Sequence, residues 1–321
     1  MKKAFIIIAI VLLVLGSAIF FAALAAARFD FKHFGTSELQ TKTYPVSEAF
    51  GNIQIDENTA EIAFALSEDG TCSVVCRESE KTARTVTVEE GTLRIVSEEE
   101  IGWKNLFNLS FKEESVTVYL PKDTYDTLLI KTHTGDAELP EGLHFNDVDV
   151  TGSTCDVRCG ASVSNKLSIQ LSTGDVTLTG ISAGAIKCIV TTGDVRMQSV
   201  SCAGDVTLQC STGRTTLDAL TCKNLQSEGS TGRVQLKNVV VSGMLAIERG
   251  TGDVAFDNCD ANEIRVKTST GDVTGSLRTA KTFVTKTSTG DVKVPESVSG
   301  GRCEITTGTG DISVRIADGQ S

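Results

Sequence analysis

The stretch Ser172–Val176 reads Ser-Thr-Gly-Asp-Val, and copies of its Thr-Gly-Asp triplet recur between residues 134 and 311. Seven copies are complete: Thr134-Gly135-Asp136, Thr173-Gly174-Asp175, Thr192-Gly193-Asp194, Thr251-Gly252-Asp253, Thr270-Gly271-Asp272, Thr289-Gly290-Asp291 and Thr309-Gly310-Asp311. Three are altered: Thr154-Cys155-Asp156, Thr212-Gly213-Arg214 and Thr231-Gly232-Arg233. Successive copies lie 19 or 20 residues apart. A fixed period of this size is typical of a solenoid, whose repeats bury their apolar faces by stacking on each other.

Apolar residues alternate with polar ones on both sides of each triplet. The position two after the glycine holds Val176, Val195, Val234, Val254, Val273, Val292 and Ile312. Apolar residues two apart turn one face of a strand inward, so each repeat is a rung made of a strand, a tight turn and a strand. Glycine supplies the positive φ of the turn, and Asp can accept hydrogen bonds from nearby backbone amides. We predict an all-β fold: a single-stranded parallel β-helix (β-solenoid) of about ten rungs over residues 128–321.

The composition excludes some partners. The chain has 321 residues, a formal net charge of −11 and only 5% aromatic residues. Nucleic acid is excluded as a partner because the chain is acidic and has no cluster of Lys and Arg. The low aromatic content suits a thin stacked core better than a wide globular one.

The N-terminal region predicts a membrane anchor. An uncharged apolar run covers residues 4–27 after Lys2 and Lys3, long enough for a helix that spans a bilayer. A signal peptide cleaved near Ala25–Ala27 is the alternative. The length of the run favours the anchor over residues 1–28, followed by a tether over 29–45. The N-terminal lysines then predict a single-pass protein of the cell membrane whose C-terminal domain is extracytoplasmic.

Residues 46–127 are expected to form a β cap over the first rung. Short alternating segments are centred on Ile53/Ile55, Ile62/Phe64/Leu66, Cys72/Val74/Cys76, Val86/Val88, Leu93/Ile95 and Val116/Val118/Leu120. Such strands cover a solenoid edge that would otherwise be open. Residues 101–111 (IGWKNLFNLSF) break the alternation and hold the only Trp. This segment either packs over the end of the core or forms an exposed apolar loop for a partner or a bilayer surface.

The ten cysteines are expected to be buried apolar fillers. Zinc is not expected at Cys72/Cys76 or Cys155/Cys159, because four residues of strand span about 13 Å. Cys202 and Cys222 share a position on adjacent rungs, so their spacing allows a disulfide.

Calcium and catalysis are the two chemical hypotheses that the pattern raises. One Asp per rung falls short of the six to eight oxygens that Ca²⁺ takes, so turn formation is the preferred role of the Asp column. Arg214 and Arg233 interrupt that column. The histidines His33, His133 and His144 have no metal-ligand spacing and no paired nucleophile. We therefore assign no catalytic, cofactor-binding or metal-binding residues, and we expect neither a cofactor nor an enzyme.

Three stretches together resemble a known family: VTVYLPKDTYDTLLIKTHTGD at residues 116–136, GTLRI at 91–95, and the repeated STGDV. They are similar to the bacterial DUF4097 domain, an adhesin-like or toastrack β-repeat domain, over residues 45–315. The resemblance implies a membrane-tethered extracytoplasmic β-solenoid, sometimes linked to envelope-stress or cell-surface signalling. It implies no catalytic residues.

The sequence thus predicts a non-enzymatic cell-surface β-solenoid with an adhesin-like, scaffolding or sensing role in the bacterial envelope. A calcium-binding repeat protein and a carbohydrate-active β-helix enzyme are the alternatives. The expected partners are the membrane, through the N-terminal helix, and an envelope protein or glycan. A second copy could dock on the final rung in the sequence, Ile305–Ile316, which we expect at the open end of the stack.

Overall fold

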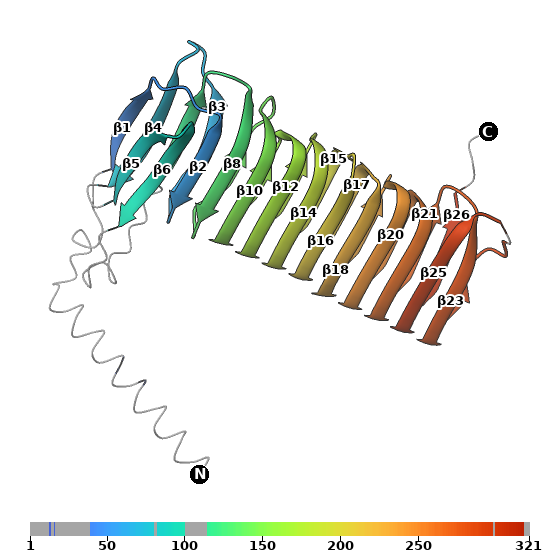
Figure 1. The fold of residues 1–321 in the computed structure, drawn as a ribbon. Helices are drawn as coiled ribbons and strands as arrows, with labels where there is room; N and C mark the ends of the chain where they lie inside the picture. The colour runs from blue at the N-terminus through green and yellow to red at the C-terminus, as the bar shows by residue number, and fades with distance from the viewer. Residues whose placement is uncertain are drawn as a thin grey trace.

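The computed structural model describes Leu13, Gly16 and residues 39–79, 82–99, 114–297 and 299–317. From residue 39 onward the described chain is all β, and its strands stack into one elongated solenoid of about nine turns (Figure 1). Most of the apolar run 4–27 and the whole segment 101–111 lie outside the described residues. No helix within the described part is both long and apolar enough to cross a bilayer.

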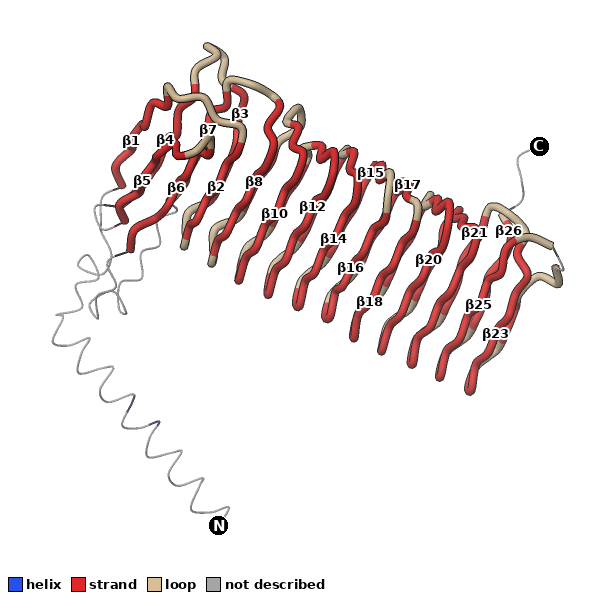
Figure 2. The backbone as a smooth tube through the Cα atoms, viewed as in Figure 1, coloured by secondary structure: helices blue, strands red, loops and turns tan. Residues whose placement is uncertain are grey.

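Each rung contributes one strand to each of two parallel ladders (Figure 2). The strands before the triplet turn are β8 Thr124–Thr132, β10 His144–Thr154, β12 Ser162–Thr173, β14 Ser182–Thr192, β16 Asp205–Thr212, β18 Asn224–Thr231, β20 Val240–Thr251, the second part of β21 Val254–Thr270, β23 Lys281–Thr289 and β25 Gly301–Thr309. The strands after it are β9 Ala137–Leu139, β11 Val157–Cys159, β13 Val176–Thr179, β15 Val195–Cys202, β17 Thr215–Cys222, β19 Val234–Lys237, the first part of β21, β22 Val273–Leu277, β24 Val292–Lys293 and β26 Ile312–Ile316.

The predicted inward positions form the core between the ladders. Val176, Val195 and Val254 are fully buried, and so are most residues at the same position in other rungs. Because neighbouring rungs place like residues on top of each other, each apolar side chain packs against its counterparts above and below. The predicted β-solenoid and its turn position are confirmed.

The turn glycines from Gly174 onward adopt positive φ, between 133° and 147°. They also lie very close to a neighbouring rung: a Cβ on Gly193 would be 2.0 Å from the carbonyl oxygen of Gly174 in the preceding rung. The first two turns differ, because neither Gly135 nor Cys155 has positive φ. The side chain of Cys155 occupies the space beside Gly152, where a Cβ would be 2.2 Å from its Sγ.

A second left-handed corner, which the sequence reading missed, lies six residues after the turn glycine. Its members are Gly180, Ser199, Ala219, Asn238 and Asn258, with φ between 52° and 67°. Only one of the five is glycine, and Ser and Ala carry no strong signal for this conformation. The corner returns the chain from the second ladder to the first.

The N-terminal segments are all strands, as predicted, but only three of them lie outside the parallel ladders. β1 Leu39–Val46, β4 Cys72–Ser79 and β5 Thr82–Glu89 pair antiparallel. β2 Asn52–Glu57 lies parallel between β6 Thr92–Glu99 and β8, and β3 Glu61–Leu66 lies parallel to β7 Ser115–Leu120 and β9. The first rung in the chain, β2 and β3, is therefore second in the parallel stack, and the rung of β6 and β7 lies outside it.

The C-terminal end corrects one expectation. We expected residues 305–316 to form the terminal rung. Instead β25 pairs with β21 on one side and β23 on the other, and β26 lies in the same way between β22 and β24. The last rung in the sequence is thus enclosed, and the rung of β23 and β24 forms the end of the stack. Sequence order alone could not show this, because either rung fits the same period.

Candidate functional site

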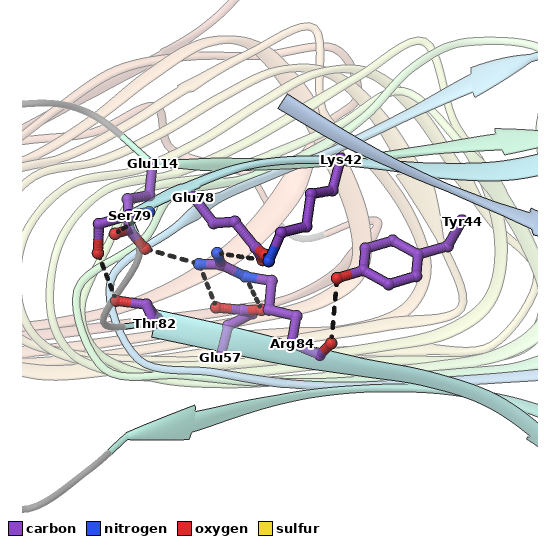
Figure 3. A network of polar contacts seen from close by, with 8 residues as sticks. All are labelled: Lys42, Tyr44, Glu57, Glu78, Ser79, Thr82, Arg84 and Glu114. Carbon is purple, nitrogen blue, oxygen red and sulfur yellow. Dashed lines mark hydrogen bonds and ion pairs between the residues drawn. The ribbon is translucent and has the colours of Figure 1, made fainter. Parts of the chain in front are cut away.

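The most concentrated group of charges lies inside the N-terminal cap, around Arg84 of β5 (Figure 3). Its Nε is 2.8 Å from Glu57 Oε1, its Nη2 is 2.9 Å from Glu114 Oε2, and its Nη1 is 3.3 Å from Glu78 Oε2. Lys42 forms an ion pair with the other oxygen of Glu78. The side chains of Arg84, Glu57 and Glu78 are completely buried. The group joins strands β1, β2, β4 and β5 and the residue before β7.

The Arg84 group lies where antiparallel strands join the parallel ladders. β4 and β5 extend the ladders beyond β7 and β6 at the N-terminal end, which brings the carboxylates of Glu57, Glu78 and Glu114 to one place. Burial alone would lower the pKa of Arg84, but its bonds to Glu57 and Glu114 outweigh burial and raise it. Burial raises the pKa of Glu57, and Arg84 offsets only part of that rise. Three carboxylates face two cations, so the guanidinium is held permanently charged within a closed polar network.

The raised pKa of Glu57 predicts a specific pH dependence. Folded Glu57 keeps its proton at a pH where the unfolded chain has lost it, so this term stabilises the fold below the ordinary pKa of 4.5 and is lost as pH rises. Glu57→Gln removes this pH-dependent contribution to stability, because glutamine does not titrate. We expect the stability of the wild type relative to this variant to fall as pH rises from below 4.5 to neutral. Denaturant midpoints across that range test it, with exposed Glu48→Gln as the control; a difference that rises with pH would contradict it.

The aspartates of the triplets connect successive rungs. Oδ1 of Asp156 accepts a hydrogen bond from the backbone N–H of Asp175 at 2.8 Å, and Oδ1 of Asp175 accepts one from Asp194 at 2.7 Å. The same bond runs from Asp311 to Asp272 and from Asp291 to Asp311. The turn role predicted for these residues is thus refined: each carboxylate binds the next rung in space. Among the described residues, no group of three or more His, Cys, Asp or Glu is arranged to hold a metal ion.

This bonding predicts the effect of removing one carboxylate. Asp194→Ala leaves the backbone N–H of Arg214 without its 2.7 Å acceptor and is expected to cost about 0.5–1.5 kcal/mol of unfolding free energy. Asp291→Ala is the matched control, because Asp291 is at the end of the stack and its carboxylate has no next rung to bind among the described residues. Calcium or a chelator is expected to leave the melting temperature of the wild type unchanged. A calcium-dependent rise of several degrees would identify the column as a metal site.

The two arginines in the column act differently from the aspartates. Nη2 of Arg233 donates to Asp253 Oδ2 at 2.8 Å, across one rung. The backbone N–H of Asp272 and this guanidinium hold the pKa of Asp253 below its ordinary value. The Arg214 side chain has no ion-pair partner among the described residues. The interruption therefore relieves the repulsion between stacked carboxylates in the middle of the column.

A buried arginine lies next to this interruption and was not found from the sequence. Arg249 is 2% exposed, and its Nη2 donates to Thr215 Oγ1 and Ser227 Oγ, both at 3.0 Å. Its Nε and Nη1 have no hydrogen-bond partner among the described residues, and burial lowers its pKa. A Cβ on Gly229 would lie 2.1 Å from Nη1, so the missing side chain makes room for the guanidinium. The sequence signal for this pocket is two polar residues at inward positions that are apolar in the preceding rung: Thr215 stands where that rung has Val195, and Ser227 where it has Leu208.

All ten cysteines are buried free thiols, which confirms the expectation that they fill the core. Burial raises the pKa of each, for example to about 12 for Cys188 and Cys303. The thiols are therefore protonated at neutral pH and are poor nucleophiles. Cys202 and Cys222, for which the spacing allowed a disulfide, are both free. His133 and His144 belong to different ends of neighbouring rungs, and His33 lies outside the described residues.

Two grooves lie on the surface of the solenoid. One of about 330 Å³ crosses the outer face near the triplet turns; it is lined by Asp56, Lys131, His133, Thr151, Gln170 and Thr191, with others. Another of about 460 Å³ lies near the C-terminal end, where buried Lys281 pairs with Asp260 at 2.6 Å. The first groove is lined mostly by residues of β8, β10, β12 and β14, and the second also by residues of the connections before β23 and β25.

Solved structures with related folds come from bacteria. A proposed lipid-binding protein from Parabacteroides distasonis has a TM-score of 0.51 and 16% identity over 74% of this chain and 97% of that one. A proposed adhesin from Bacteroides fragilis has a TM-score of 0.42 and 14% identity, over 88% and 98%. A proposed adhesin from P. distasonis has a TM-score of 0.47 and 13% identity, also over 88% and 98%. At these identities the likeness concerns the fold alone. No curated protein matches the sequence.

The family model described as Toastrack DUF4097 matches the chain in two segments, residues 50–209 and 203–321. Together they span the chain from β2 onward, including Arg84, its three glutamates and the Asp column, whereas β1 with Lys42 lies before the first segment. The chain therefore belongs to the Toastrack DUF4097 family.

Proposed function

We propose that this protein is a non-enzymatic, adhesin-like or scaffolding module of the bacterial envelope, tethered to the membrane by residues 1–28. The observation that carries the proposal is how the repeated polar residues are used. The carboxylates of the triplets bind backbone amides of the next rung, so the pattern that defines the repeat serves to build a long regular body. The buried carboxylates of the cap are likewise engaged by Arg84.

The outward faces of the strands provide the binding surface in this proposal. Lys131, Thr151 and Gln170 lie along the 330 Å³ groove at successive rungs and offer charged and hydrogen-bonding groups at a regular spacing. Neighbouring rungs are about 4.8 Å apart, which suits an extended polar ligand such as a glycan or a segment of an envelope protein. Adhesin-like relatives share this architecture, and an adhesin role for this chain rests on the proposal.

Protease added to intact cells or protoplasts tests the tethered, outward-facing arrangement. We expect the domain from residue 29 onward to be digested while a cytoplasmic marker protein stays intact. Complete protection of the domain until the cells are lysed would reject it. Full-length protein should also retain envelope glycans or envelope proteins in a pull-down, and a Gln170→Ala/Thr151→Ala variant should retain less. Equal retention by both proteins would show that the ligand does not bind in this groove.

A further inference from the structure

The two ends of the solenoid are built differently. At the N-terminal end, antiparallel strands extend both ladders: β5 pairs with β6, β4 with β7, and β1 with β4 (Figure 1). At the other end the stack stops at an ordinary parallel rung. Among the described residues, β23 pairs only with β25 and β24 only with β26. This edge therefore presents a row of backbone N–H and C=O groups without strand partners.

The core is also uncovered at this edge. Val292 holds the inward position that follows the turn, where Val273 and Ile312 of the neighbouring rungs are completely buried, yet it is 43% exposed. Val284 on the outer side of β23 is 46% exposed. Phe283 and Thr285, whose counterparts Cys303 and Ile305 are buried, are only partly covered. Apolar groups that every other rung covers on two sides are covered here on one.

We infer that this edge is a self-association surface and that a second copy of the chain covers it, edge to edge, about a two-fold axis. Two identical edges related by such an axis run antiparallel, which is the same kind of pairing that closes the N-terminal end. The ladder of β23 then continues into the partner, β23 onto β23. Head-to-tail stacking would instead set β23 against β5 of the next copy and give open-ended filaments, not a closed dimer.

The sequence of β23 selects a register. Inward and outward side chains alternate, so inward residues meet inward residues only if the axis passes through a residue. An axis through Thr285, the middle of Lys281–Thr289, pairs all nine residues of the strand. Phe283 then faces Thr287 of the second copy, and Val284 faces Lys286. The two Lys286 side chains are not opposite each other, and Lys281 is already paired with Asp260.

The size of the edge predicts a reversible dimer. A nine-residue strand is about 30 Å long and the two sheets are about 10 Å apart, so the footprint is on the order of 300 Å² per copy. Stable interfaces bury about 1,200–2,000 Å² in total, well above twice this footprint. We therefore expect association that depends on concentration. It is independent of the proposed ligand groove, which lies at the other end of the solenoid.

Opposite charges introduced at Val284 test both the dimer and its register. Val284→Glu places a carboxylate opposite Lys286 of the second copy, twice per dimer, and Val284→Lys places like charges there. Sedimentation of the full-length protein in detergent should give a dissociation constant that is about two- to tenfold lower for Val284→Glu than for the wild type, and higher for Val284→Lys by a similar factor. Val284 is exposed and points outward, so both variants should keep the wild-type circular dichroism spectrum.

A wild-type protein that stays monomeric at every concentration would overturn the inference. If Val284→Glu and Val284→Lys weakened association equally, the inference would be overturned too. Such a result would mean that Val284 makes an apolar contact and does not lie opposite Lys286 of the second copy. Association through the N-terminal apolar run would be insensitive to both variants, and that result also rejects the edge-to-edge dimer. Digestion of the domain on intact cells would be unaffected, so failure here leaves the proposed function standing.

Discussion

Replacing Arg84 with methionine is expected to lower the free energy of unfolding by about 3–5 kcal/mol, because it leaves buried carboxylates without their cation. Glu57 and Glu78 are fully buried, and Arg84 contacts both. Methionine keeps much of the side-chain volume, so the loss reports on charge more than on packing. Chemical denaturation of the full-length protein, followed by circular dichroism, measures the change.

Two further variants separate this effect from a general one. Arg158→Met removes a surface arginine that is 54% exposed and lies 3.6 Å from Asp136, and it should cost less than about 1 kcal/mol. Adding Glu57→Gln to Arg84→Met removes one of the uncompensated charges and should restore part of the lost stability. If Arg84→Met costs no more than Arg158→Met, the buried group does not hold the cap.

Gly193→Val is expected to destabilise the solenoid by about 3–5 kcal/mol, since two separate obstacles coincide there. Its φ of 143° is a conformation that a β-branched residue strongly resists. A Cβ would also lie 2.0 Å from the Gly174 carbonyl oxygen, so the rungs would have to move apart. Denaturation midpoints measure the loss, and slowed recovery of the spectrum on refolding would accompany it.

Gly70→Val is the matched control for the first obstacle alone. Gly70 has φ of 71° in an exposed turn, and a Cβ there would meet no atom within 4 Å. We expect a cost of about 1–2 kcal/mol, from the backbone conformation only. Equal costs for the two variants would show that close approach between rungs adds nothing.

The β-solenoid could be predicted because its signals repeat. The Gly of each triplet and the Val two residues later occur at a constant period, so every rung repeats the evidence of the one before. The aspartates lie at the predicted turn, but the bonds that the structure shows for their carboxylates are to amides of the neighbouring rung and not to amides within the turn. Only the stacking distance shows that Asp175 bonds forward to Asp194.

Other features could not be predicted, either because they occur once in the chain and have no repeat to reveal them or because their residue type varies from rung to rung. The second corner uses Gly180, Ser199 and Asn238 with no shared residue type. The Arg84 group joins residues from Lys42 to Glu114, 72 positions apart, brought together by antiparallel strands whose order no period encodes. Arg249 depends on substitutions in other rungs at Thr215, Ser227 and Gly229. The predicted order of the C-terminal rungs was wrong because all rungs have the same kind of strand edge, so the sequence does not show which rung ends the stack.

The enclosed position of β25 and β26 has a consequence for how the protein is made. Residues 281–293 leave the ribosome before residues 301–316, yet their partners in both ladders belong to that later segment. During translation the stack can grow by adding each new rung to the previous one only as far as β22. The end of the molecule then stays unfolded until residues 301–316 have been synthesised. A chain truncated just before residue 301 would thus leave Phe283 without the strand that covers it, while its earlier rungs would still resist protease.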